Sequence, residues 1–367
     1  MSPELEVQLI AVIVAAACAL PGVFLVLRRM AMLSDAISHT VLLGIVLAYF
    51  VSGTLGSPLL FVGAVAMGVI TVALVELVGG TGLVREDAAI GIVFPALFSI
   101  AVILISRYAG NVHLDVDSVL LGELIFAPFD RVTLLGLDLP RALLIGAVTL
   151  AINLALIGLL DKELKLTSFD PGLAAALGFA PGLLHYGLMT MVSVTAVGAF
   201  DAVGSILVIA LMVAPPAAAY LLTDRLPVML LLSVLIGALS AIAGYWAAYW
   251  LDVSVGGAMA TMTGVAFGLA LLFAPGRGLV AGAARRKRQR WEFAQQMLAL
   301  HLLNHEGASE ASEECTPQHL RAHLRWRADF ADEVVRRAER GGLVRREGAV
   351  LTLTEHGRQV AREASLR

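Results

Sequence analysis

Two ionisable residues stand inside an apolar stretch near the start of the chain. Asp35 and His39 are four positions apart, so on a helix both side chains lie on one face. Ionisable groups are costly inside a membrane-length apolar segment and are functional candidates for that reason. A carboxylate oxygen beside an imidazole nitrogen suits Mn²⁺, Fe²⁺ or Zn²⁺. The pair predicts a metal site, and the alternative is a mutually satisfied pair that fixes helix packing.

A further carboxylate stands in the acidic segment between residues 106 and 142. Glu123 is the one charged residue within the apolar stretch 118–129, which we expect to form a short re-entrant or interfacial helix. The neighbouring Asp115, Asp117 and Asp138 are typical of a solvated acidic loop, which would still raise the local concentration of cations. Glu123 is therefore the strongest candidate in this segment for a role inside the membrane.

Four histidines near the C-terminus form two pairs with helical spacing. His301 and His305 are four residues apart, and so are His319 and His323. Each pair can present two imidazoles on one helix face, as metal sites require. One interpretation is a cytoplasmic metal sensor, and the other is a set of exposed polar helix positions.

Residues 162–181 form a long loop with a short internal helix. Asp170 before Pro171 is typical of a helix start, because Asp caps free backbone amides and Pro suits the first helical position. We expect the helix over 173–177, with Gly178 as its stop. Its small-residue face could fit into a groove of another protein, and the alternative is a surface helix without a partner.

The elements that carry these residues belong to a membrane protein. The chain has 367 residues, of which 59% are hydrophobic and 15% charged, whereas soluble domains contain about 25% charged residues. Two cysteines exclude a disulfide framework. Apolar runs of about 20 residues predict membrane helices. We expect nine membrane helices, at 7–27, 36–56, 58–75, 88–106, 142–160, 182–200, 202–223, 226–251 and 253–276. A tight turn at Asp201 would separate the sixth helix from the seventh.

The distribution of basic residues predicts the domains and their orientation. Residues 1–276 carry 9 of the 26 Lys and Arg residues, and the remaining 17 lie in 277–367. Basic loops face the cytoplasm, so we expect the N-terminus outside and the C-terminus in the cytoplasm of a bacterial-type inner membrane. We divide the chain into a membrane domain over 1–276, a basic linker over 277–290 and a small cytoplasmic domain over 291–367. The cluster 285–290 would attract anionic lipid.

The small domain reads as helices at 293–303, 317–324 and 330–340, a hairpin within 341–354 and a last helix at 355–364. This order resembles a winged-helix domain. The segment LTEHGR at 353–358 is similar to the segment after the wing in metal-dependent and multidrug-type repressors. The domain is basic, as a phosphate-binding surface must be, but tethering to a membrane hinders a genomic search. We expect docking or regulation rather than nucleic-acid binding.

Several segments of the membrane domain resemble permeases of metal-ion ABC importers. The resemblance covers roughly residues 5–275 and rests on five ordered segments: MLSDAISH at 32–39, REDAAIG at 85–91, DVDSVLLGE at 115–123, Phe169 to Pro171 with Ala175 and Gly178, and VGSILVIAL at 203–211 with Pro215. The chain departs from the family at Thr40 and at Leu42 and Leu43, where many relatives have Ala and Leu-Pro.

This resemblance implies an all-α polytopic bundle that imports manganese, iron or zinc and is not itself an enzyme. It implies a second permease subunit, two cytoplasmic ATPases and an extracytoplasmic metal-binding protein. The chain has no P-loop motif for ATP, and we expect no permanently bound cofactor. The resemblance assigns Asp35 and His39 to the metal path, with Glu123 as the third ligand, and the Phe169–Gly178 segment to ATPase coupling. The alternative is a membrane-anchored, metal-responsive winged-helix regulator.

Overall fold

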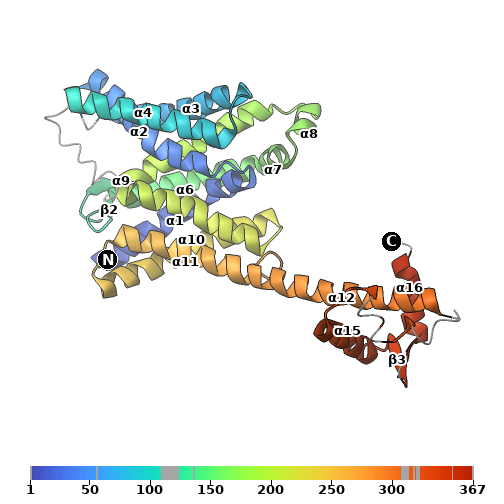
Figure 1. Cartoon of the computed structure of the whole chain (residues 1–367). Coiled ribbons are helices and arrows are strands. Elements are labelled where there is room, and N and C mark those ends of the chain that lie inside the picture. The colour runs from blue at the N-terminus through green and yellow to red at the C-terminus, as the bar shows by residue number, and fades with distance from the viewer. Residues whose placement is uncertain are drawn as a thin grey trace. The chain divides into compact units, whose positions relative to one another are not determined.

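The computed structural model describes residues 2–54, 57–108, 124–134, 137–306, 314–316, 319, 323–348 and 350–365. The chain divides into two units, Met1–Gly278 and Leu279–Arg367 (Figure 1). Unit 1 contains the apolar helices and unit 2 contains the polar C-terminal part.

Within the described residues, nine helical segments of unit 1 are long and apolar enough to cross a membrane, as the sequence predicts. Two of them belong to one long helix, α9. The helices are α1 (Pro3–Leu27), α2 (Met32–Ser52), α3 (Pro58–Gly80), α4 (Glu86–Tyr108), α6 (Arg141–Leu159), α9 (Pro181–Leu222), α10 (Leu226–Leu251) and α11 (Val255–Phe273).

The centre of unit 1 is formed by α1 and α9. Helix α1 packs against α6, α9 and α10, while α9 also contacts α2, α3 and α11. Figure 1 shows α2, α3 and α4 along one side of the unit and α10 and α11 along the other. Close approach depends on small residues, since a Cβ on Gly22 of α1 would lie 2.0 Å from the carbonyl oxygen of Met212 in α9.

The helix that carries Asp35 and His39 is held firmly against α3. A Cβ on Gly44 of α2 would lie 2.3 Å from the carbonyl oxygen of Gly63, so the two backbones nearly touch. The hydroxyl of Thr71 donates a 2.7 Å hydrogen bond to Thr40, which in turn donates to the carbonyl of Ala36. Helix α2 continues through the positions that depart from the family pattern and ends at Gly53, whose φ is 68°.

Three local features of unit 1 differ from the prediction. The expected turn at Asp201 is wrong, because the chain stays helical there and breaks at Gly204, whose φ of 76° and ψ of 163° are open to glycine. The long inner loop contains two helices, α7 (Asp161–Phe169) and α8 (Pro171–Ala176). Strands β1 (Arg131–Leu134) and β2 (Leu137–Pro140) form an antiparallel hairpin in the acidic segment.

Unit 2 contains α12 (Leu279–His305), α15 (Ala328–Arg340), β3 (Val344–Glu347), β4 (Val350–Leu353) and α16 (Glu355–Ser365). Residues 279–290, which belong to the expected linker, are helical in the structure, because α12 begins at Leu279. Alanine, arginine, lysine and glutamine favour helix, and they outweigh the single Gly282. The core packs Leu298 and Leu302 of α12 against Val334 of α15 and Leu351 of β4.

The predicted hairpin and the helices on either side of it are present in unit 2. Strands β3 and β4 pair in an antiparallel register that joins Val344 to Leu353, and Gly348 in the turn has a φ of 66°. Of the predicted helix 317–324, most residues lie outside the described part of the chain. The described part of unit 2 is therefore a helical unit with one two-stranded sheet. These elements alone do not define a winged helix.

Candidate metal site and coupling segment

The structure brings Asp35 and His39 together on the first two turns of α2. The Nε2 atom of His39 lies 3.3 Å from Oδ1 of Asp35, and the two side chains are 25% and 37% exposed. Ser34 and Ser38 lie nearby on the buried side, and their hydroxyls donate to carbonyls of the preceding turn. The two hydroxyl groups are thus satisfied within the helix. The side chains of Asp35 and His39 are the ones here that still have lone pairs to offer a metal ion.

The separation of these two atoms matches two ligands on one ion. Tetrahedral Zn²⁺ with bonds of about 2.0–2.2 Å holds neighbouring ligand atoms roughly 3.3 Å apart. Among the described residues, no three His, Cys, Asp or Glu side chains are positioned to hold an ion. Metal binding by Asp35 and His39 therefore stays a prediction, and Glu123, the predicted third ligand, lies outside the described residues.

Aromatic rings from α4 cover the imidazole. The ring of His39 lies 5.3 Å from that of Phe94 and 5.8 Å from that of Phe98, measured between centroids. Phenyl rings offer no ligand and exclude water, which strengthens the attraction between a cation and the Asp35 carboxylate. Neither phenylalanine stands out in the sequence. The two are four residues apart within an apolar run, but ordinary helix packing produces the same spacing.

A polar network joins the end of α1 to α7 and α9. The guanidinium of Arg28 donates to the hydroxyls of Ser168 at 3.1 Å and Thr167 at 3.0 Å, both in α7. A third nitrogen lies 3.2 Å from Nδ1 of His185 in α9. Arg28 thus ties α7, which directly precedes most of the predicted coupling segment, to two central helices. Its loop position in the sequence does not reveal this role.

The same network extends to α3 through Glu76. Nε2 of His185 lies 2.8 Å from one carboxylate oxygen of Glu76, and the hydroxyl of Tyr186 donates a 2.5 Å hydrogen bond to the other. The chain from Ser168 through Arg28 and His185 to Glu76 spans four helices. Glu76 therefore connects α9 to α3. From its position at the end of an apolar run, the sequence indicates only an anchor at the membrane interface.

The predicted coupling segment contains a short helix, although α8 runs over Pro171–Ala176 rather than over the expected 173–177. A carboxylate oxygen of Asp170 accepts a 2.9 Å hydrogen bond from the amide of Leu173, with Pro171 at the helix start. Gly178 follows the helix with a φ of 87°, in the left-handed region that favours glycine. Phe169, Leu173 and Leu177 are 63%, 47% and 61% exposed. Helix α8 with Phe169, Ala175 and Gly178 thus forms an exposed, largely apolar surface.

The four C-terminal histidines also come together in space. The rings of His301 and His323 are 5.1 Å apart, and those of His319 and His323 are 5.7 Å apart. The two pairs, each predicted separately, therefore form one cluster in unit 2, which is called the histidine cluster below.

Comparison with known proteins identifies a family and close relatives. The model of the ABC 3 transport family matches residues 5–274. The zinc transport system membrane protein TroD of Treponema pallidum is 52% identical over 357 residues, which cover 97% of each chain. The manganese transport system membrane protein MntD of Bacillus subtilis is 52% identical over 286 residues, or 78% of this chain and 97% of that relative. These relatives confirm the predicted class, a permease subunit of a metal importer and not an enzyme.

Solved structures agree with this class. The PsaBC structure from Streptococcus pneumoniae, in complex with Fab, is 28% identical with a TM-score of 0.63, and it covers 76% of this chain and 94% of its own. An inward-facing metal-chelate type ABC transporter shares the fold at 20% identity and a TM-score of 0.51, over 72% of this chain and 84% of its own. Because the family model spans most of unit 1 and two relatives exceed 50% identity, the chain belongs to the ABC 3 transport family.

Proposed function

We propose that the chain carries manganese or zinc across a bacterial inner membrane through a path that includes Asp35 and His39. The observation that supports this most strongly is the Asp35–His39 pair, 3.3 Å apart and partly exposed within a bundle of apolar helices. The relatives are described as zinc and manganese transport proteins. None of the relatives or solved structures reported above is described as an iron transporter, so iron has less support than the other two metals.

The depth of the pair in the membrane fits a path that opens inward. With the N-terminus outside, α2 begins on the cytoplasmic side, and His39 lies about 10 Å along a helix of about 31 Å. Helix α4 also begins on that side, and Phe94 and Phe98 lie about 12 Å and 18 Å from its start. The rings of His39, Phe94 and Phe98 would then form the inner wall of the path. Glu123 follows the fourth span, so the same orientation places this predicted ligand toward the outer end of the path.

The exposed surface of α8 is the proposed contact with the ATPase. It lies after the fifth span, so the same orientation places it in the cytoplasm, where ATP hydrolysis occurs on the partner. Arg28 would transmit its movement to α1 and α9. We further propose a second permease subunit, an extracytoplasmic binding protein as metal donor, and anionic lipid beside residues 285–290. The winged-helix interpretation of unit 2 also belongs to this proposal, as a docking or regulatory domain.

The membrane-anchored regulator of transcription is not supported by a specific observation. Anchoring needs one helix, whereas unit 1 has nine spans among its described residues and a family match over nearly its whole length.

Uptake of radiolabelled Mn²⁺ and Zn²⁺ by cells tests the proposed path. We expect Asp35→Ala and His39→Ala each to abolish uptake while the protein remains in the membrane, because a partly dehydrated ion would lose one of few ligands in a low dielectric. Asp138→Ala, which removes an exposed carboxylate on the hairpin, is the matched control and should transport normally. Near wild-type uptake by both path variants would refute the site.

A further inference from the structure

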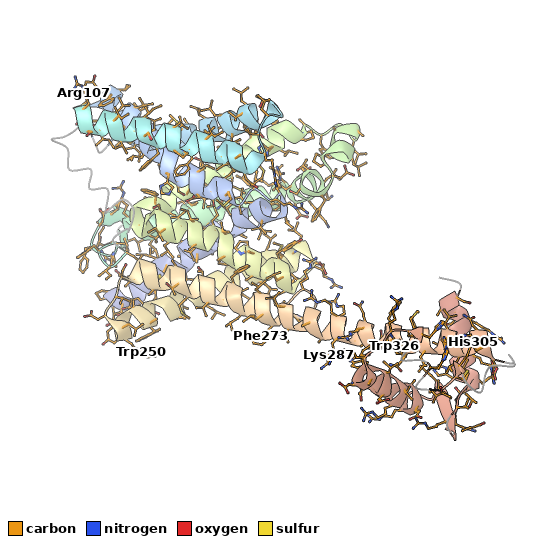
Figure 2. The ribbon with its side chains drawn as sticks, in the orientation of Figure 1. Arg107, Trp250, Phe273, Lys287, His305 and Trp326 are labelled. Carbon is orange, nitrogen blue, oxygen red and sulfur yellow. The ribbon has the colours of Figure 1, made fainter. Side chains whose placement is uncertain are left out.

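The histidine cluster joins side chains from two segments of unit 2. His301 and His305 lie on the last turns of α12, and His305 is labelled at that end in Figure 2. His319 and His323 come from the segment that precedes α15. The centroid of the His301 ring lies 4.6 Å from that of His305, 6.4 Å from that of His319 and 5.1 Å from that of His323. His323 likewise lies within 6.4 Å of the other three rings, so His301 and His323 together join the cluster.

These separations are those of imidazoles that share an ion. Two histidines on a tetrahedral Zn²⁺, with bonds of about 2.0–2.1 Å, place their ring centroids on the order of 5 Å apart. The five measured pairs in the cluster range from 4.6 to 6.4 Å. No three ligand side chains in the described part of the chain already enclose one point, so binding requires the rings to turn by rotation about their side-chain bonds.

Glu314 orients two of the rings in the way that metal sites require. Nε2 of His301 lies 3.4 Å from the backbone carbonyl oxygen of Glu314, and Nδ1 of His305 contacts the Glu314 carboxylate. Histidine ligands characteristically donate their second ring N–H to such an oxygen, which fixes the tautomer. Nδ1 of His301 and Nε2 of His305 are then the nitrogens that remain for an ion.

The four side chains of the cluster are all imidazoles, which offer nitrogen ligands. His301 is 7% exposed and lies beside the buried core of unit 2. An all-imidazole set suits Zn²⁺ better than Mn²⁺, which prefers oxygen ligands.

We propose that His301, His305, His319 and His323 bind a zinc ion, with Glu314 as the residue that orients them. Binding would fasten the segment before α15 to the end of α12, since each contributes two ligands. Because unit 2 would lie on the cytoplasmic side, the ion would report the metal concentration inside the cell. We further propose that occupancy slows transport. This regulatory part rests on the proposed function, whereas zinc binding does not.

Calorimetric titration of the purified full-length chain in detergent with Zn²⁺, and separately with Mn²⁺, tests the site. The test variant is His305→Gln/His323→Gln, because both residues are more exposed than His301 and their replacement disturbs the core least. We expect it to bind one zinc equivalent fewer than the wild type, with little change for Mn²⁺. His356→Gln, on exposed α16 outside the cluster, is the matched control and should bind as the wild type does.

Unchanged zinc stoichiometry in the cluster variant would overturn the proposal, and so would an equal loss in His356→Gln. A second variant, His319→Gln, guards against a folding defect, since it leaves both α12 histidines in place and should weaken zinc binding at least tenfold. Asp35→Ala/His39→Ala must keep this zinc equivalent, which separates failure of the cluster from failure of the transport path.

The regulatory part is tested by uptake in cells preloaded with zinc. Wild-type uptake should fall after preloading, while His305→Gln/His323→Gln should keep its rate. Equal slowing of both proteins would refute regulation by the cluster and would leave the binding result as it stands.

Discussion

The side chain of Arg28 connects three helices of unit 1, namely α1, α7 and α9. It follows α1 directly and makes hydrogen bonds or close polar contacts to Ser168, Thr167 and His185. A guanidinium can satisfy several partners in fixed directions at once, which an ammonium cannot. Arg28 therefore links α7 to the end of α1 and to α9.

Replacement of Arg28 should uncouple transport from ATP hydrolysis. Arg28→Ala removes hydrogen bonds that involve a charged group, each worth roughly 1.5–3 kcal/mol, and frees the coupling segment from the central helices. We expect fewer metal ions transported per ATP in vesicles reconstituted with the ATPase, with Arg28→Lys intermediate. A wild-type ratio in Arg28→Ala would show that the coupling segment acts by another route.

At the residue scale, the sequence predicts which neighbouring residues share a helix face. It does not predict which residues from distant segments join them. The spacing of Asp35 and His39 places them on one helix face, and the structure gives a direct 3.3 Å contact. The spacing of His301 and His305 likewise predicts one pair. That a second pair packs onto it depends on the tertiary fold of unit 2, which local spacing does not encode.

At the element scale, α2 is positioned by contact of its backbone with α3. Gly44 has no room for a side chain because the carbonyl of Gly63 occupies that space, whereas a Cβ on Gly91 of α4 meets no atom within 4 Å. Gly44 is therefore needed for the close contact of two helices, and Gly91 is not. Both belong to apolar helices, and neither stands out in the sequence.

This difference predicts opposite effects of one substitution. Gly44→Ala should separate α2 from α3, displace Asp35 and His39 and lower both thermal stability and uptake, since overpacking costs about 1–3 kcal/mol. Gly91→Ala should be neutral or stabilising by up to about 1 kcal/mol, because alanine favours helix. Thermal denaturation in detergent and metal uptake measure both effects. Similar losses in the two variants would contradict the close contact.

The sequence predicts helix boundaries where capping residues mark them. It does not predict boundaries that depend on how helices pack against one another. Asp170, Pro171 and Gly178 predict α8 because each acts on the local backbone. The linker expected before residue 290 is helical in the structure because its alanine and basic residues favour helix. The continuity of α9 past Asp201, with its break at Gly204, depends on how its two halves pack in the bundle.

A charge on the exposed face of α8 should disrupt assembly with the ATPase. Ala175 is exposed while Ala174 is fully buried, so Ala175→Arg alters the surface without entering the core. We expect weaker co-purification of the ATPase and slower transport. Leu83→Arg changes another exposed residue on the same predicted side and is the matched control. Gly178 is a poorer test position because any side chain there strains the backbone. Normal co-purification of Ala175→Arg would refute the contact.

At the scale of the whole molecule, two separately packed units share one chain. Unit 1 has its own core around α1 and α9, and unit 2 has a second core between α12, α15 and the hairpin. MntD aligns over 97% of its own length but matches only 78% of this chain. TroD aligns over 97% of this chain and therefore extends into unit 2. The two relatives thus differ in how much of this chain they match.

Truncation after Gly278 should leave a stable and active permease. The cut removes unit 2 and leaves the core of unit 1 intact, since that core contains no residue beyond 278. We expect insertion into the membrane, a thermal midpoint in detergent close to that of the full chain, and uptake at wild-type rate in zinc-depleted cells. The zinc equivalent assigned to the histidine cluster should be lost on titration. If the truncated chain inserts but does not transport, unit 2 takes part in the transport cycle itself rather than in its regulation.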